Sequence, residues 1–284
     1  MKAYKGFNKD MTCRGFKYEV GKEYETDTAD VCNSGFHACE YPLDCFDYYA
    51  PSESVYCEVE QSGEISKAND DTKVASTKIK IGAEIGIKGL IKAAFEFVKE
   101  RCTNEEIGAD YSALTGGNRS ALTGGNLSAL SGGDQSALTG GDRSALTGGY
   151  RSALTGGYRS ALTGGYRSAL TGGDQSALTG GYRSALTGGD RSALTGGYRS
   201  ALTGGDRSAL TGGYRSALTG GYCSVVYGGE GSKVSGGLHS VLAIQFWKDD
   251  EFECIKFKEV DGEKIKPNTF YKLDEAGRFV EVKE

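Results

Sequence analysis

The residues best suited to acid–base chemistry lie in the first sixty positions of the chain. His37 has Glu40 and Asp44 close by in sequence, and Glu58 lies on a later segment. An imidazole beside carboxylates can move protons in general acid–base catalysis. A single histidine flanked by aromatic residues is more often structural, however, and we therefore expect no catalytic residues and no enzyme activity.

The same region offers a possible metal site. Cys32, His37, Cys39 and Cys45 could together ligate zinc, but the chain has no Cys-x-x-Cys pair of the kind that such sites commonly use. Without a secretion signal, cysteines are expected to be free thiols in a reducing compartment. We therefore expect no metal and no cofactor, and we expect small buried thiols at the eight cysteines, Cys13, Cys32, Cys39, Cys45, Cys57, Cys102, Cys223 and Cys254.

A second set of distinctive side chains belongs to a tandem repeat between Asp110 and Tyr222. The octad Gly-Gly-x-Arg-Ser-Ala-Leu-Thr recurs there almost unchanged, which is typical of a solenoid of stacked units. The residue at position x is Tyr in one set of alternate octads and Asp in the other, so that identical residues lie sixteen apart, with Tyr158 as an exception. The Tyr column holds Tyr150, Tyr166, Tyr182, Tyr198 and Tyr214, and the Asp column holds Asp142, Asp174, Asp190 and Asp206. The columns predict a flattened β-solenoid with sixteen residues per coil, a ladder of Tyr rings and coils about 4.8 Å apart.

Within the octad, Arg-Ser-Ala-Leu-Thr is expected to form a short strand. Gly-Gly-x is expected to form the turn, because glycine accepts a positive φ. Alternation puts Ser and Leu on one face, and we place that face inside because an exposed Leu column would be a large apolar patch. The opposite arrangement, with Ala and Thr inside and Leu on a dimer surface, stays open. The first arrangement buries Leu146, Leu154, Leu162, Leu170, Leu178, Leu186, Leu194, Leu202 and Leu210, and exposes Thr147, Thr155, Thr163, Thr171, Thr179, Thr187, Thr195, Thr203 and Thr211.

The flanking segments complete an all-β dominated fold. Residues 1–66 show alternating strands and a short helix near Pro42, typical of a small α+β domain. Lys78–Ile87 alternates strictly and is expected to start the solenoid, and Lys88–Arg101 is expected to be an amphipathic capping helix, although a membrane-surface helix has the same pattern. The predicted domains are 1–66, an α+β domain; 67–109, the first coil and capping helix; 110–245, the solenoid; and 246–284, a β cap.

Composition narrows the class of protein. The net charge is −5, no apolar run approaches the roughly 18 residues of a membrane span, and the first nineteen residues are polar, unlike a signal peptide. We therefore expect a cytoplasmic protein without a membrane interaction.

Regular surface ladders suggest several kinds of ligand. Calcium is not expected, because the period is eight and the Gly-x-Asp of a calcium-binding nonapeptide is absent. Arg files beside Tyr rings suit nucleic acid or another polyanion, but neighbouring Asp residues balance the charge, so nucleic acid is not expected. The exposed ladders are expected to comprise Arg143, Arg159, Arg191 and Arg207, Asp142, Asp174, Asp190 and Asp206, and Thr147, Thr163, Thr179, Thr195 and Thr211.

The paired octads resemble the sixteen-residue repeats of bacterial ice-nucleation proteins, which carry Tyr on alternate octads. The resemblance covers Asp110 to about Tyr222 and implies a β-solenoid with a Tyr ladder that can act as a dimer seam. It departs from that family where Thr-x-Thr is replaced by Ala-Leu-Thr, so one of two Thr files is missing.

Two further resemblances concern residues outside the array. A Tyr-x-Gly-Phe strand, Gly35 to Cys39, and a strand ending in Glu58 or Glu60 resemble the layout of ADP-ribosyltransferases, but Gly6 stands where an Arg is wanted and Ala38 where Ser or Thr is wanted. The whole layout is similar to uncharacterised proteins of bacteriophages and gut bacteria, which offer no activity to carry over.

These observations lead to one expectation for function. We expect a non-enzymatic repeat scaffold that binds a protein partner or forms a homodimer through the Tyr ladder, since Tyr is favoured at interfaces. The alternatives are an ice-binding protein, an ADP-ribosyltransferase-like first domain and a polyanion binder. The residues expected to carry self-association are Tyr150, Tyr166, Tyr182, Tyr198 and Tyr214.

Overall fold

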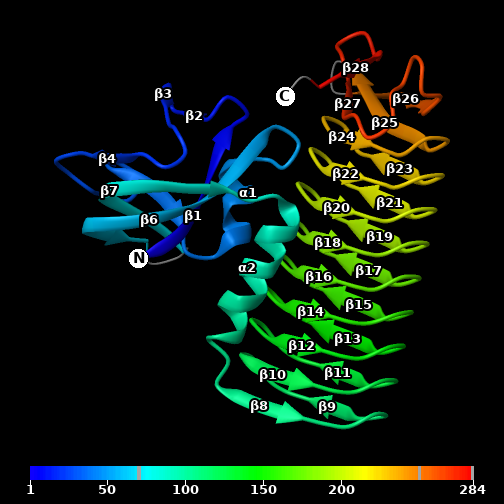
Figure 1. The fold of residues 1–284 in the computed structure, drawn as a ribbon, viewed down its shortest axis with the longest axis horizontal. Helices are drawn as coiled ribbons and strands as arrows, with labels where there is room; N and C mark the ends of the chain where they lie inside the picture. Colours follow the sequence, from blue (N-terminus) through cyan, green and yellow to red (C-terminus); the bar gives the residue numbers. More distant parts are fainter. Residues whose placement is uncertain (69–71, 249–250, 283–284) are drawn as a thin grey trace. The chain divides into compact units, whose positions relative to one another are not determined.

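The computed structural model describes residues 1–68, 72–248 and 251–282 (Figure 1). The chain divides into two compact units, Met1–Ala94 and Phe95–Glu284, and the division falls inside helix α2 (Ile87–Lys99). The fold is dominated by β structure, as predicted, with a small β/α unit followed by a β-solenoid. Among the described residues, no helix has the length and apolar character needed to cross a membrane.

Unit 1 is built on an antiparallel sheet that closes on itself. Its strand order is β4-β7-β5-β1-β6, and β6 also pairs with β7, so four strands form a ring around a core that includes Phe7, Ile79 and Ile81. The elements are β1 (Lys2–Asn8), β2 (Thr12–Cys13), β3 (Phe16–Lys17), β4 (Glu23–Glu25), β5 (Phe36–Cys39), the 3-10 turn η1 (Pro42–Asp44), α1 (Cys45–Tyr48), β6 (Ser54–Lys67) and β7 (Lys73–Glu84).

The segment Lys78–Ile87 does not start the solenoid, contrary to the sequence prediction. Most of it lies in β7, which pairs antiparallel with β4, β5 and β6 of unit 1. Strict alternation identifies a strand with one buried face, but it does not say which sheet that strand joins. The solenoid starts about twenty residues later, at β8 (Asn104–Ile107).

The predicted amphipathic helix is present as α2, at Ile87–Lys99. The first coil of the solenoid is nevertheless open. All four residues of β8 are exposed, and so is Tyr111 in the following turn, so the described residues give this end no cover of the kind a capping helix would provide.

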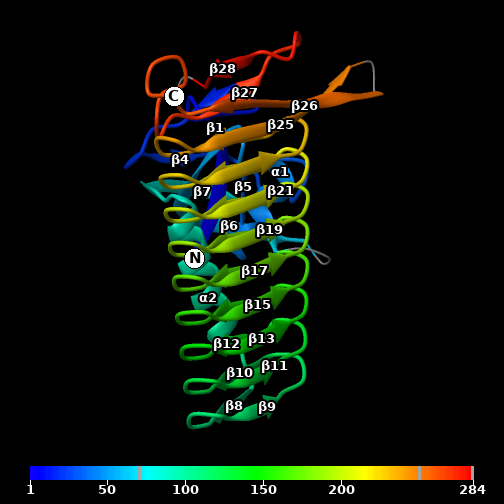
Figure 2. The ribbon, with the colours of Figure 1, turned by 90° about the vertical axis from the view of Figure 1, so that its right-hand side faces the viewer.

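Unit 2 is a solenoid of two facing parallel sheets (Figures 1 and 2). Each strand pairs with the strand sixteen residues later, so identical residues stack in register, as Leu170 does on Leu186. The even sheet contains β8, β10 (Ser120–Thr123), β12 (Ala137–Thr139), β14 (Ala153–Thr155), β16 (Ala169–Thr171), β18 (Ala185–Thr187), β20 (Ala201–Thr203), β22 (Ala217–Thr219) and β24 (Lys233–Ser235). The odd sheet contains β9 (Ala113–Thr115), β11 (Ala129–Ser131), β13 (Ala145–Gly148), β15 (Ala161–Gly164), β17 (Ala177–Gly180), β19 (Ala193–Gly196), β21 (Ala209–Gly212), β23 (Val225–Gly228) and β25 (Val241–Lys248).

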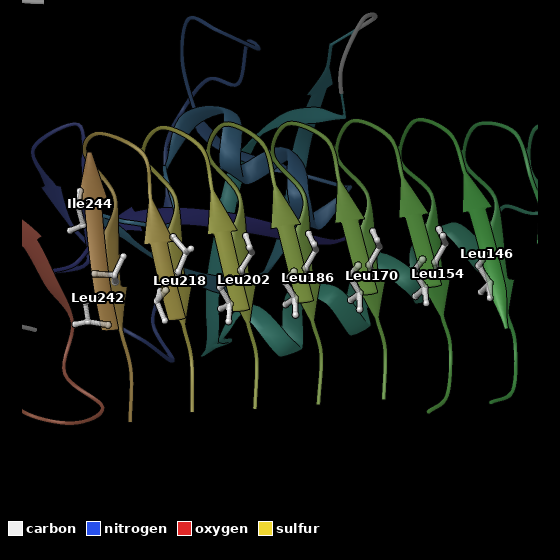
Figure 3. Packing of buried hydrophobic residues seen from close by; sticks show 14 of the residues in the cluster. Leu146, Leu154, Leu170, Leu186, Leu202, Leu218, Leu242 and Ile244 are labelled. Atoms are coloured by element: carbon white, nitrogen blue, oxygen red, sulfur yellow. The ribbon is translucent and has the colours of Figure 1, made fainter. Parts of the chain in front are cut away.

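Leucine fills the space between the two sheets, as predicted. Every leucine from Leu146 to Leu210 that was expected inside is at most 1% exposed, and Figure 3 shows these side chains following one another along the stack. The arrangement with Leu outside is therefore wrong. The buried Ser column adds hydrogen bonds between coils: the Ser184 hydroxyl accepts from the Ser168 amide at 3.3 Å and donates to the Gly165 carbonyl at 3.2 Å.

The glycines of the array do not supply the left-handed turn residue, contrary to the sequence prediction. That conformation belongs to the residue after x, such as Arg143 with φ of 58° and Gln175 with φ of 60°. The glycines instead leave room for neighbours. A Cβ on Gly156 would lie 2.7 Å from Cβ of Ser160, and a Cβ on Gly157 would lie 2.2 Å from Oδ1 of Asp142.

The chain beyond β25 closes the far end of the solenoid. Strand β26 (Glu251–Glu259) pairs antiparallel with β25, and β27 (Tyr271–Leu273) pairs antiparallel with β24 and with β28 (Phe279–Glu281). Val260, Ile265 and Tyr271 are buried in the same cluster as Leu242. This segment consists mainly of strands, as the predicted β cap does, and its buried side chains cover the core of the last coil.

Candidate functional sites

The two columns at position x lie on opposite edges of the solenoid. Turns from the odd sheet to the even sheet form the Tyr edge, which carries Tyr150, Tyr166, Tyr182, Tyr198 and Tyr214. Turns from the even sheet to the odd sheet form the Asp edge, which carries Asp142, Tyr158, Asp174, Asp190 and Asp206.

The Tyr rings form a stacked column closely associated with arginine. Ring centroids of Tyr198 and Tyr214 are 5.3 Å apart with planes inclined by 17°, and those of Tyr150 and Tyr166 are 5.7 Å apart. The guanidinium of Arg167 lies 4.9 Å from the Tyr166 centroid and donates to the Tyr150 hydroxyl at 2.9 Å. Such cation–π and hydrogen-bond contacts stabilise the column within the chain. Self-association through these rings stays a prediction.

The Asp column has a structural role that the sequence analysis missed. Oδ1 of Asp190 accepts a hydrogen bond from the backbone amide of Asp206 at 2.8 Å, and Oδ1 of Asp174 accepts from the Asp190 amide at 2.9 Å. In the first coils, Oδ1 of Asn118 and Oδ1 of Asn126 accept hydrogen bonds from the backbone amides of Asp134 and Asp142, sixteen residues later, at 2.9 and 2.8 Å. The sequence could have indicated this role, because position x of the octad holds both Asp and Asn, the two residue types whose short side chains end in an acceptor oxygen. These carboxylates join successive coils.

The arginines of the Asp edge point to solvent, as expected. Arg143, Arg159, Arg191 and Arg207 are exposed, and Nε of Arg159 donates to the Gln175 side chain at 2.9 Å. Because these cations alternate with exposed aspartates, the edge has mixed charge rather than the continuous positive strip that a polyanion favours.

The two sheets differ in how their outer faces are exposed. On the odd sheet, the outward alanines and threonines from Ala145 to Thr211 are all exposed, so Thr147, Thr163, Thr179, Thr195 and Thr211 lie where predicted. We call this surface the open face; its exposed alanines are Ala145, Ala161, Ala177, Ala193 and Ala209. On the even sheet the corresponding alanines are buried, and the expectation of full exposure is wrong for the half-buried Thr155, Thr171, Thr187 and Thr203.

Unit 1 contains a cavity of about 940 Å³ that the sequence analysis did not predict. It is lined by residues of β1, β5, α1 and the β2–β3 hairpin, which the ring of strands brings together. The hairpin turn consists of Arg14 and Gly15, both with positive φ, which is the type I′ geometry of a two-residue hairpin. Arg14 and Phe16 of this hairpin contribute to the cavity wall.

His37 lines the cavity, but its imidazole is committed to the backbone. Nε2 accepts a hydrogen bond from the Cys32 amide at 3.0 Å, which occupies the lone pair that a general base would need. Burial lowers the pKa of His37, and the positive charges of Lys73, Lys5 and Arg14 lower that pKa further. Both effects favour the neutral form of His37, whose hydrogen bond positions the Cys32 segment.

The carboxylates near His37 in sequence are also engaged elsewhere. Glu40 forms an ion pair with Lys67 at 2.6 Å, and Glu58 forms one with Lys2 at 2.9 Å. Asp44 is fully buried and accepts a hydrogen bond from the Thr72 hydroxyl at 2.5 Å. Each of these three carboxylates therefore forms a contact with a side chain other than His37.

The structure also bears on the other residues considered for chemistry. A Cβ on Gly6 would lie 2.6 Å from the Tyr49 ring, so the close packing of that ring explains the glycine. Across the described ranges, no three His, Cys, Asp or Glu side chains gather as metal ligands would, and Cys32, His37, Cys39 and Cys45 form no such group. All eight cysteines are free thiols; Cys39, Cys45 and Cys57 are buried, whereas Cys32 and Cys223 are exposed, so burial of every thiol was a wrong expectation.

Comparison with known proteins concerns mainly unit 1. Residues 1–93 match the model of a family described as a domain of unknown function (DUF7666), and these residues coincide closely with Met1–Ala94. No curated protein and no solved structure matches the chain. The comparisons therefore give no support to the resemblance to ice-nucleation repeats or to phage proteins, and the chain is similar over its first third to a family without an assigned activity.

Proposed function

We propose that this protein is a non-enzymatic repeat scaffold whose open face binds a second copy of the chain. The observation that carries the proposal is the exposure of every outward alanine and threonine of the odd sheet from Ala145 to Thr211. The open face bears only Ala and Thr between Ala145 and Thr211, so its association requires no desolvation of charge.

A second copy is the partner whose geometry fits this face. Because the strands pair in parallel and in register, one Ala and one Thr recur on the open face at every inter-strand spacing, as at Ala161–Ala177 and Thr163–Thr179. A surface that complements the open face along its whole length must have the same spacing, and the open face of a second copy has that spacing. Two such faces related by a twofold axis would pack as the sheets of a β-sandwich do.

The size of the face predicts weak association. The five strands from β13 to β21 span four spacings of about 4.8 Å, and three residues across give an open face of roughly 200 Å² per copy. That area is about a quarter of the ~800 Å² per partner in a standard stable interface. We therefore expect a dimer in the micromolar range or weaker.

Sedimentation velocity over a series from micromolar to millimolar protein tests the proposal. Combined substitutions Thr163→Lys, Thr179→Lys and Thr195→Lys place three cations on the open face and should leave a monomer at all concentrations. The matched control is Tyr182→Asp with Tyr198→Asp on the Tyr edge, which should dimerise like the wild type. Loss of the dimer in the Tyr variant alone would place the interface on the Tyr edge, and a wild-type monomer throughout would refute self-association.

Ice binding is a second candidate, supported by the exposed Thr file of the open face. A flat surface of methyl and hydroxyl groups at strand spacing is the type of surface that a crystal lattice with a fixed repeat can match. A protein that acts on ice through the open face should keep that face free of a second copy, should show thermal hysteresis and should lose that activity with the three Thr→Lys substitutions. Absence of hysteresis at millimolar concentration eliminates this candidate.

A further inference from the structure

The cavity of unit 1 contains positive charge that the protein does not neutralise. Lys5, Arg14 and Lys73 all line it, and within the described part of the chain none of them forms an ion pair with a carboxylate. The acidic residues that line the cavity are Glu25 and Asp47. Glu25 is paired with Lys78 at 3.0 Å, so one carboxylate of the lining faces three cations.

Lys5 is the most informative of these cations. Its side chain is 5% exposed, its Nζ donates to the His37 carbonyl at 2.7 Å, and it lies 5.4 and 5.7 Å from the centroids of Phe7 and Tyr18. The ammonium group of Lys5 is thus held by a carbonyl and two ring faces, and no carboxylate of the described residues pairs with it. Burial of such a charge is costly unless an anion accompanies it.

The three cations converge on one corner of the cavity. Each of them acts electrostatically on His37, which lies on β5 beside β1, the strand that carries Lys5. Nζ of Lys73 is 3.4 Å from Sγ of Cys32, whose amide in turn donates to His37. The imidazole of His37 supplies no negative charge to balance these cations, so this corner is suited to an anion with several oxygen acceptors, such as a phosphate.

Aromatic rings form another part of the wall. Phe16, Tyr18, Tyr24 and Phe36 contact one another with centroid distances between 4.8 and 6.5 Å. Phe16 is 49% exposed, and Tyr48, which also lines the cavity, is 48% exposed. Nζ of Lys73 lies 4.6 Å from the centroid of the Tyr48 ring, so the half-exposed ring of Phe16 is the one that offers a face on which a planar ring can stack.

From these contacts we infer that the cavity of unit 1 binds a nucleotide, with the phosphate at the corner formed by Lys5, Arg14 and Lys73 and the base against the aromatic wall. The cavity volume of about 940 Å³ lies within the roughly 300–1,000 Å³ typical of small-molecule sites. Arg14 lies at the tip of the β2–β3 hairpin and lines the same cavity as Lys73. This site is independent of the proposed self-association.

Isothermal titration of the full chain with AMP, adenosine and inorganic phosphate tests the inference. We expect AMP to bind at least tenfold more tightly than adenosine or phosphate, because only AMP engages both the cations and the rings. Arg14→Ala and Lys73→Ala should each weaken AMP binding about tenfold, whereas adenosine binding should change little.

Lys80→Ala is the matched control, because Lys80 lies on the same strand as Lys73 but pairs with Glu23 at 3.6 Å and does not line the cavity. Thermal unfolding of each variant establishes that unit 1 stays folded. Equal affinity for AMP and adenosine, unchanged AMP binding in both cavity variants, or no binding of AMP, GMP, CMP or UMP at millimolar concentration would overturn the inference.

Discussion

Replacing the aspartates of the Asp edge by alanine should destabilise the solenoid, whereas replacing them by asparagine should not. Oδ1 of Asp174, Asp190 and Asp206 accepts the backbone amide of the next coil at 2.9, 2.8 and 2.7 Å. Alanine removes the acceptor. Asparagine keeps it, as Asn118 and Asn126 do in the first coils of the same protein.

The magnitude follows from the exposure of this edge. A hydrogen bond to a charged group contributes about 1.5–3 kcal/mol when protected, but water can partly replace an exposed acceptor, so about 1 kcal/mol per bond is the better estimate. The triple alanine variant should therefore lose roughly 3 kcal/mol. The triple asparagine variant should match or slightly exceed the wild type, since it also removes like charges stacked about 4.8 Å apart.

Urea unfolding followed by far-ultraviolet circular dichroism measures the difference between the two triple variants. Hydrogen exchange resolved by residue adds a local test, because the amides of Asp190, Asp206 and Tyr222 should lose protection in the alanine variant and keep it in the asparagine variant. Equal midpoints for the two variants, with equal protection of these amides, would refute the view that the Asp column is a structural ladder.

Three further predictions concern single positions. Gly133→Ala should cost about 1–3 kcal/mol, because its Cβ would lie 2.2 Å from Oδ1 of Asn118, whereas Gly117→Ala, which meets nothing within 4 Å, should be tolerated; urea midpoints compare them. Arg191→Gly should stabilise by a few tenths of a kcal/mol and Arg191→Val should destabilise by more than about 1 kcal/mol, because this residue has φ of 56°; thermal unfolding measures both. Burial raises the pKa of the Cys57 thiol to about 11, so the folded protein keeps a proton that the unfolded chain loses above pH 9; stability should fall as the pH rises from 9 to 11, and Cys57→Ala should flatten that slope in urea titrations.

The solenoid could be predicted from the sequence because the octad repeats every eight residues and two octads make one coil of sixteen residues. A column of identical residues sixteen apart implies parallel strands in register, and alternation then places Leu146 inside and Thr147 outside. Outside the octads, the sequence predicted individual strands but not the strands with which they pair. Alternation in Lys78–Ile87 indicated a strand, but its partners β4, β5 and β6 depend on contacts distant in sequence.

The cavity of unit 1 could not be predicted for the same reason. Lys5, Arg14 and Lys73 come from strands and turns separated by up to 68 residues, and no spacing in the sequence indicates that they meet. Their isolation from carboxylates is a property of the folded ring of strands. The role of His37 also required the structure, because the hydrogen bond from the Cys32 amide decides whether its Nε2 is available.

Some positions of the octad are explained by the structure of the coil, and one position is not. Both glycines, the serine and the leucine are explained by close approach, hydrogen bonds and burial within the stack, as at Gly156, Gly157, Ser160 and Leu162. The arginine is different, because a left-handed conformation disfavours any residue with a Cβ, and Gly231 shows that the turn accepts glycine there. On the Tyr edge the arginines stack on the rings, and on the Asp edge Arg159 stacks on Tyr158 and donates to Gln175. Arg143, Arg191 and Arg207 are exposed, and these contacts do not explain why their positions hold arginine.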